Sequence, residues 1–428
     1  MYYFLKLGRA AAFALIVQSA LSSLSGAPLR LNKAQAVLRA VQQNPALRAA
    51  RTIIDQANGS ASQAGRWQNP ELSLDYSTDR WFNNQGERSV GLGFEQRFPV
   101  TNRLSLQKAI ARDEVELAQA EVSNQVRLLC AEVESAVARV AALQAQLQLR
   151  EQIIGLNRTF ASFIETRIET GEASSIEANQ VKIELYAVEQ ELQALENKLL
   201  SERAALKLLM GMEVDTSIEL SHQFKLPATA PKLPALTADA LANHPEYRMK
   251  SLLSGIADNR VSAAKAARWA DVAVRVFFEE ARSVDVPSGL GTDRSFGVGV
   301  SIPLPWMNRN QGLIEVSRAQ QRQIKYELDA VGLKLRSEVS VQRERALRLY
   351  AQAQQYDQNL TQLVVQNVAD MNTAYSAGQI SLAERFRSQQ QGLKIQSTQL
   401  AKLHEFEQAM ILWKAATAAC QLPHCQNK

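Results

Sequence analysis

Apolar residues recur at helical spacing over unusually long stretches of this chain. Within residues 103–167 they lie three or four positions apart on one seam: Val122, Val126, Leu129, Val133, Val137, Val140, Leu143 and Leu147. The same spacing returns between Leu185 and Leu199, and it is typical of a coiled coil. We therefore expect a helix from about Arg103 to Arg167, roughly 95–100 Å long, packed against a second long helix.

Four shorter segments alternate between apolar and polar residues, which is the period of a β-strand. Leu72, Leu74 and Tyr76 alternate with polar neighbours, and residues 90–94, 272–278 and 296–302 show the same pattern. The segments predict two hairpins, at about residues 70–98 and 271–304. A hairpin of this length either crosses a membrane or lies half-buried in a soluble domain, and alternation alone leaves both interpretations open.

The order of these elements occurs twice, with matching motifs roughly 200 residues apart. Asn44-Pro45 in the first copy corresponds to His244-Pro245 in the second, and Gly171 corresponds to Gly378. We therefore expect a first repeat at residues 28–220, a second repeat at residues 235–419 and a tail at residues 420–428. Three prolines make residues 221–234 an extended linker: Pro227, Pro231 and Pro234.

Each repeat is expected to place a helix on either side of its hairpin. The preceding helices are predicted at residues 31–67 and 236–269. The second long helix, which follows the hairpin of the second repeat, is predicted from about Asn310 to Ala377.

Composition and charge exclude several classes of function. The 428 residues include only 19 Gly and 12 Pro, and aromatic residues make up 6%, so long helices are favoured over a compact enzyme fold. The net charge of +5 is dispersed, which argues against a nucleic-acid partner. No phosphate-binding loop or histidine cluster is present, so the sequence predicts no catalytic residues, no cofactor and no metal site.

The N-terminus predicts export from the cytoplasm. Lys6 and Arg9 precede an apolar run and then small residues, so residues 1–27 are interpreted as a cleaved signal peptide. An uncleaved anchor or a buried helix is the alternative. No other stretch has 18 consecutive apolar residues, so no further transmembrane helix is expected.

The two cysteines of the tail, Cys420 and Cys425, are expected to form a disulfide in an oxidising compartment. A metal-binding tail that includes His424 is the alternative, but these three ligands leave a tetrahedral site incomplete.

The duplication, the Asn-Pro and His-Pro openings, the hairpins and the glycine breaks together resemble the TolC family of outer-membrane efflux proteins. The resemblance extends from Leu31 to about Cys420. It implies a mainly α chain with a membrane β-barrel: a TolC-like channel-tunnel in the outer membrane of a Gram-negative bacterium, with an α-barrel of coiled-coil helices that extends into the periplasm. Four strands cannot close alone, and two copies would leave little lumen. Strand closure does not fix the number of copies, but the resemblance implies a homotrimer with a twelve-stranded barrel.

The resemblance also implies partners and cargo. The expected partners are a periplasmic adaptor, an inner-membrane pump of the resistance-nodulation-division class and outer-membrane lipid. Segments 68–72 and 302–312 are similar to the branch that works with heavy-metal pumps, so we expect a passive exit duct for metal cations. Two alternatives remain: an exit duct for drugs or type I protein secretion, and a secreted coiled-coil scaffold without a pore.

The resemblance assigns the helical turns at the two glycines to the periplasmic end, where the adaptor docks. The residues expected to dock it surround these turns: Arg167, Thr170, Gly171, Ser174, Tyr375, Gly378 and Ser381. The alternative is that these are ordinary solvated loop residues.

Acidic residues six positions after such glycines ring the closed entrance in the family, and here they correspond to Glu177 and Glu384. Six carboxylates from three chains would attract cations and repel one another, as in a cation-selective or pH-sensitive gate. The family has a second acidic position where this chain has Arg387. That change weakens the acidic ring and offers Glu384 a partner. In the alternative interpretation both glutamates are ordinary carboxylates on a helix surface.

Overall fold

The computed structural model describes residues 29–82, 85–285, 288–356 and 358–419. The predicted signal peptide, Cys420, Cys425 and His424 lie outside these residues. No helix in the described part of the chain combines the length and the apolar character that a membrane crossing needs.

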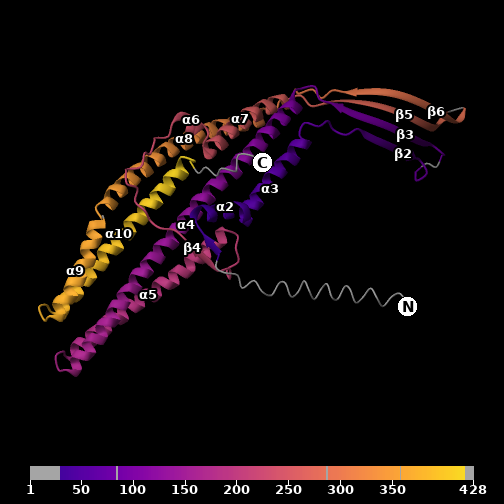
Figure 1. Ribbon diagram of the computed structural model, residues 1–428. Coiled ribbons are helices and arrows are strands. Elements are labelled where there is room, and N and C mark those ends of the chain that lie inside the picture. Colours follow the sequence, from indigo (N-terminus) through magenta and orange to yellow (C-terminus); the bar gives the residue numbers. More distant parts are fainter. Residues whose placement is uncertain (1–28, 83–84, 286–287, 357, 420–428) are drawn as a thin grey trace, which may run out of the picture. The chain divides into compact units, whose positions relative to one another are not determined.

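The same series of elements occurs twice along the chain (Figure 1). The first series is β1 (Leu29–Leu31), α2 (Lys33–Gln43), α3 (Pro45–Gln63), β2 (Glu71–Thr78), β3 (Arg88–Phe98), α4 (Arg103–Glu169) and α5 (Ser175–Leu209). The second series is β4 (Ile218–Leu220), α6 (Ala238–Ala242), α7 (Pro245–Ala266), β5 (Val272–Asp285), β6 (Gly289–Ser301), α8 (Gln311–Gln354), α9 (Gln358–Ser376) and α10 (Leu382–Ala416). In this order α8 and α9 together correspond to α4.

Three helices that we expected to be continuous are broken. The helix predicted at residues 31–67 is divided into α2 and α3 at Asn44, and the one at residues 236–269 is divided into α6 and α7 at His244. A proline follows each of these residues, and proline lacks an N–H and disfavours the helical conformation of the residue before it. The Asn44 side chain instead accepts a hydrogen bond from the Leu47 N–H at 2.9 Å.

The helix predicted from Asn310 to Ala377 is also broken, since α8 ends at Gln354 and α9 begins at Gln358. The carbonyl of Tyr356 accepts a hydrogen bond from Gln399 Nε2 of α10 at 2.9 Å. This bond replaces one that a continuous helix would have made. In contrast, α4 runs unbroken for 67 residues, as its seam predicted.

The chain forms two compact units, and helices α3, α4 and α8 each pass from one unit into the other. The first unit comprises Met1–Arg48, Gln125–Leu236 and Arg336–Lys428. Its core confirms the predicted seam, since Val133, Val137 and Val140 are fully buried. The parallel pair β1 and β4 also belongs to this unit.

The segment between β4 and α6 lies in the first unit up to Leu236 and has no helix or strand, but it is attached to the core. Leu233 is buried in a cluster with Tyr350, Phe406 and Trp413. The Tyr350 hydroxyl donates a hydrogen bond to the Pro227 carbonyl at 3.1 Å.

The second unit comprises Ala49–Asn124 and Thr237–Leu335, and it contains a sheet in the order β2-β3-β5-β6. All of its strand pairs are antiparallel, and the pairing of β3 with β5 joins the two hairpins. At the base of the sheet Arg103 Nη2 donates to both carboxylate oxygens of Asp271, at 2.9 and 3.1 Å. This ion pair ties the start of α4 to the start of β5.

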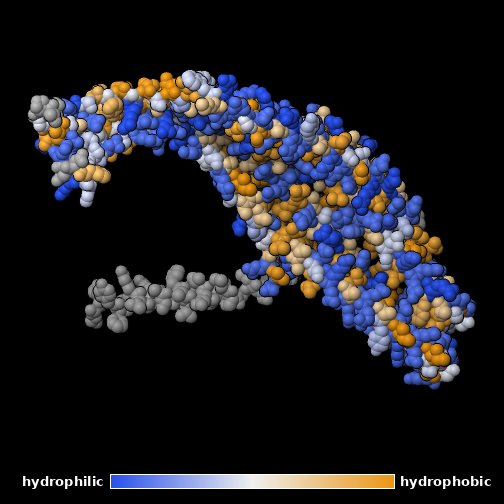
Figure 2. All heavy atoms as spheres, turned by 180° about the vertical axis from the view of Figure 1, so that it is seen from behind, coloured by the Kyte–Doolittle hydropathy of each residue, from blue (hydrophilic) through white to orange (hydrophobic). Residues whose placement is uncertain are grey.

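The register gives the sheet one mainly apolar and one mainly polar face. The apolar face carries Leu72, Leu74, Tyr76, Val90, Leu92, Phe94, Val276, Phe278, Phe296, Val298 and Val300, and nearer the hairpin turns it also carries Glu280 and Arg294. The polar face carries Ser73, Asp75, Gly91, Gly93, Glu95, Arg275, Glu279, Gly297 and Gly299, together with Phe277. Figure 1 shows that no helix of this unit covers either face, and Figure 2 shows hydrophobic residues exposed along the sheet.

Candidate functional site at the helical tips

Two tight turns end the helical pairs α4–α5 and α9–α10 at the same end of the first unit (Figure 1). Gly171 has φ +77° and Gly378 has φ +67°, a left-handed conformation that glycine adopts without a steric penalty. The Glu172 N–H bonds to the Arg167 carbonyl at 2.8 Å, and the Gln379 N–H bonds to the Ala374 carbonyl at 2.9 Å. These bonds close each helix in the glycine-dependent manner expected of a C-terminal cap.

The helix that follows each turn begins with a capping box. In α5 the Ser174 hydroxyl accepts from the Glu177 N–H at 3.2 Å, and the Glu177 carboxylate accepts from the Ser174 N–H at 3.1 Å. In α10 the corresponding bonds between Ser381 and Glu384 measure 3.3 and 2.8 Å. The two predicted gate carboxylates therefore also stabilise helix N-termini, a role that the sequence interpretation had not assigned to them.

Glu384 is held in its charged form at neutral pH. Hydrogen bonds from the Ser381 N–H and then from its hydroxyl lower the pKa of Glu384. Arg387 adds a weaker electrostatic effect on this pKa in the same direction. Arg387 is exposed, and within the described residues it forms no ion pair with Glu384.

Tyr375 links the two tips. Its side chain is buried with Phe160, Ile164 and Val181, and its hydroxyl donates to Glu177 Oε1 at 3.4 Å. Burial, followed by the neighbouring Glu177 carboxylate, raises the pKa of Tyr375, so the hydroxyl remains protonated. Because Tyr375 is buried, it supports the tip from within its core.

The other predicted docking residues lie nearer the surface. Thr170, Gly171, Ser174, Gly378 and Ser381 are exposed. Arg167 is half-buried, forms an ion pair with Glu172 at 3.3 Å and lies over the Phe163 ring at 5.7 Å. The tip therefore presents small polar groups around the turns.

Arg385 is a buried charge in the tip that sequence reasoning missed. Only 3% of its surface is exposed, and its guanidinium carbon lies 3.5 Å from the centroid of the Phe160 ring. Its Nε donates to the Asn372 side chain at 2.8 Å. Burial lowers the pKa of Arg385 to about 10, so the group remains charged at neutral pH.

A second buried polar contact lies next to Arg385. Gln389 Nε2 donates to Asn157 Oδ1 at 2.8 Å, and both side chains are buried. The sequence signal that could have located Arg385 and Gln389 inside the bundle was periodicity. Both residues fall on the same face of α10 as Leu382, at spacings of three and four residues. A charged and an amide residue on an otherwise inward face indicate a polar contact inside the bundle.

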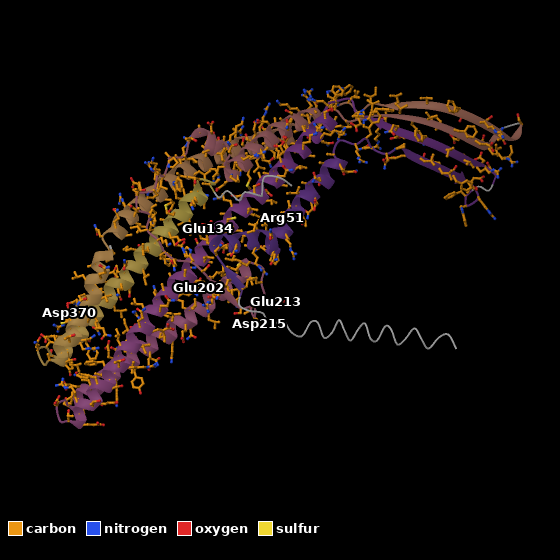
Figure 3. The ribbon with its side chains drawn as sticks, in the orientation of Figure 1. Arg51, Glu134, Glu202, Glu213, Asp215 and Asp370 are labelled. Atoms are coloured by element: carbon orange, nitrogen blue, oxygen red, sulfur yellow. The ribbon has the colours of Figure 1, made fainter. Side chains whose placement is uncertain are left out.

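A separate charged cluster in the first unit surrounds Glu407 of α10. Its carboxylate accepts from Lys33 Nζ at 3.0 Å and contacts His222 Nε2 at 2.8 Å. Glu134 projects from α4 and lies 3.9 Å from the same lysine (Figure 3). Burial alone would raise the pKa of Glu407, but the hydrogen bonds from His222 and Lys33 outweigh it and lower the pKa.

Burial lowers the pKa of the nearby His404. In the described residues no three His, Cys, Asp or Glu side chains are grouped so as to bind a metal ion.

Comparison with known families gives a match over part of the chain. Residues 36–212 match the model of the outer membrane efflux protein family. No curated protein sequence matches this chain.

The fold is shared with solved outer-membrane channels over nearly the whole chain. CusC is similar with a TM-score of 0.74 at 18% identity, over 92% of this chain and 95% of that chain. VceC of Vibrio cholerae is similar with a TM-score of 0.72 at 18% identity, over 90% and 95%. MtrE of Neisseria gonorrhoeae, in its open state, is similar with a TM-score of 0.70 at 15% identity, over 90% and 88%.

The structural matches confirm the predicted fold of a TolC-like channel-tunnel. The resemblance to the heavy-metal branch stays a prediction, because CusC is similar to this chain to nearly the same degree as VceC.

Proposed function

We propose that three copies of this chain form the exit duct of a tripartite efflux system that carries heavy-metal cations to the outside of the cell. An adaptor contacts the helical tips, and an inner-membrane pump supplies the energy. The observation that carries this proposal is the sheet of the second unit, which has one apolar face, one polar face and two edge strands, β2 and β6.

The two edge strands of the sheet need partner strands from further copies of the chain. Within lipid every backbone N–H and C=O must be paired, because water is absent. Pairing β2 of one copy with β6 of the next satisfies both edges, turns the apolar faces to lipid and leaves the polar faces to line the passage.

The polar face favours cations as cargo. Its carboxylates outnumber its guanidinium groups: Glu71, Asp75, Glu95, Glu279 and Asp293 against Arg97 and Arg275. Arg97 lies 3.3 Å from Glu95, and Arg275 lies 3.6 Å from Asp75, so the excess negative charge remains after pairing. A passage with a negative lining concentrates cations.

A groove in the first unit offers a docking surface for the adaptor. It has a volume of about 880 Å³. Its lining combines apolar residues of α4, α5 and α10, such as Leu149, Leu195 and Leu393, with four basic and two acidic residues. Arg150 and Lys402 form ion pairs with the two acidic residues, Glu191 and Glu405, at 2.9 Å, so the excess positive charge is carried by Lys198 and Lys394. An amphipathic helix of the adaptor, with an apolar stripe flanked by acidic residues, suits this surface.

The gate is tested by separating charge from capping. Glu177→Gln with Glu384→Gln removes the charges and keeps the capping boxes, because glutamine also serves at this position. Ser174→Ala with Ser381→Ala keeps the charges and removes the caps, at about 1 kcal/mol each. In planar bilayers we expect the glutamine variant alone to lose cation preference. Equal selectivity of the glutamine variant and the wild type would contradict the gate.

The cargo is tested by deleting the protein from its host and measuring susceptibility. Loss of tolerance to cobalt, zinc, cadmium or copper supports metal efflux. Sensitivity to drugs alone would transfer the cargo assignment to drugs, and a protein that fractionates away from the outer membrane would contradict the duct itself.

A further inference from the structure

A row of hydrogen-bond donors crosses the apolar face of the sheet at the end where the hairpins turn. In the strand register Thr78 lies opposite Arg88, Arg88 opposite Arg282, and Arg282 opposite Thr292. These four side chains share the face of Leu74 because strand residues alternate between faces. Both arginines are exposed.

Arg88 and Arg282 are directly opposed like charges. Opposed side chains on neighbouring antiparallel strands have Cβ atoms roughly 5 Å apart, and equal charges at that distance destabilise the pair. Among the described residues neither arginine forms an ion pair, whereas Arg294 in the next row pairs with Glu280 at 2.8 Å. An anion placed between the two guanidinium groups relieves this repulsion.

In the membrane position that the proposed function gives the sheet, the row lies at the depth of lipid headgroups. The other end of the strands leads to the helices, which reach into the periplasm, so the hairpin turns point to the outside. Trp81 and Phe82, just beyond the row, are 85% and 91% exposed, and aromatic side chains gather at membrane interfaces. Arginine on a lipid-facing strand costs about 0–1 kcal/mol near the interface but about 2–4 kcal/mol at mid-depth.

We propose that Arg88 and Arg282 bind the phosphate groups of a phosphorylated glycolipid in the outer leaflet of the outer membrane. This inference rests on the membrane position of the sheet given by the proposed function. Each guanidinium matches phosphate with two parallel hydrogen bonds. The hydroxyls of Thr78 and Thr292 donate from either side, and the apolar rows below receive the acyl chains.

The test measures lipid retention by the purified full-length trimer in detergent, using native mass spectrometry. The probes are bisphosphorylated lipid A, its dephosphorylated form and inorganic pyrophosphate. Arg88→Gln with Arg282→Gln is compared with Arg97→Gln plus Arg275→Gln, which removes the same charge from the opposite face. Arg88→Lys with Arg282→Lys keeps the charge but loses the paired hydrogen bonds.

We expect the Arg88→Gln/Arg282→Gln variant to retain about tenfold less lipid A than the wild type, with intermediate retention by the lysine variant and no change in the opposite-face control. Equal retention by the glutamine variant and the wild type overturns the site. Equal retention of the dephosphorylated lipid overturns phosphate recognition, and displacement of lipid A by pyrophosphate overturns the assignment to a lipid. Absence of a wild-type trimer counts against the proposed duct, whereas an intact trimer with unchanged retention overturns only the lipid site.

Discussion

Arg385 should be replaceable by methionine at little cost but not by lysine. Burial lowers the pKa of Arg385 to about 10, and this fall corresponds to about 3 kcal/mol lost by moving the charge out of water. Two contacts offset this cost. Stacking over Phe160 at 3.5 Å contributes about 2 kcal/mol for a desolvated pair, and the charged hydrogen bond to Asn372 contributes about 1.5–3 kcal/mol.

The two replacements shift this balance differently. In Arg385→Met the desolvation cost and both contacts disappear together, and a flexible apolar chain fills the space, so we expect a change within about 1 kcal/mol. In Arg385→Lys the buried charge remains, but the planar stacking over Phe160 is lost. We expect the tip to be destabilised by about 2 kcal/mol.

Amide hydrogen exchange followed by mass spectrometry reports this local stability. A loss of about 2 kcal/mol accelerates exchange roughly 30-fold in the segments around Phe160 and Arg385. Arg387→Lys, an exposed change on the same helix, serves as the control and should exchange like the wild type. If Arg385→Met exchanges as fast as Arg385→Lys, or if neither variant differs from the wild type, then the stacking and the hydrogen bond do not offset the desolvation cost of Arg385.

Glycine replacement and acid should also weaken defined parts of the first unit. Gly171→Ala should cost about 1–2 kcal/mol from its left-handed backbone alone, because nothing lies within 4 Å of the added Cβ. Gly211→Ala should lower the melting temperature in detergent further, since its Cβ collides with the Gln43 carbonyl as well. An equal fall of the melting temperature in the Gly171→Ala and Gly211→Ala variants would contradict a steric role of the Gln43 carbonyl. The lowered pKa of Glu407 means that its stabilising contribution is present above the ordinary pKa near 4.5 and is lost as the pH falls through the lower folded value. The lowered pKa of His404 acts in the same direction below about pH 6.5. Urea midpoints should therefore fall on acidification, and the fall below about pH 5 should be smaller in Glu407→Gln than in the wild type. If the midpoint falls equally with pH in both proteins, Glu407 does not contribute to the acid sensitivity.

Much of the local structure followed from short-range patterns in the sequence. The α4 seam and the strand alternation were predicted correctly because period and burial are coupled through backbone geometry. The breaks at Asn44 and His244 have a local signal, since each of these residues precedes a proline. We nevertheless predicted one continuous helix at each place, because the apolar pattern continues on both sides. The break after Gln354 has no such signal. Its freed carbonyl is satisfied by Gln399, which is distant in sequence.

At the tips, the sequence located the turns and the acidic residues but not their contacts. The spacing from Ser174 to Glu177 and from Ser381 to Glu384 is that of a capping box, so the structural role of both glutamates also follows from the local sequence. That Tyr375 would be buried and reach Glu177 could not be predicted, because the contact joins the two repeats.

The sequence by itself determined the long helices, the alternating strands and the glycine turns, because each depends on residues within a few positions of one another. It also determined the repeats, because the same motifs recur in the same order. Only the tertiary structure decided that β3 pairs with β5, that Arg385 stacks on Phe160 and that Arg88 faces Arg282. These contacts join segments that are far apart along the chain, and no local period specifies which face or strand will meet another. The tertiary structure thereby placed charges that are dispersed along the sequence in a buried cation site and in a row of guanidinium groups on the sheet.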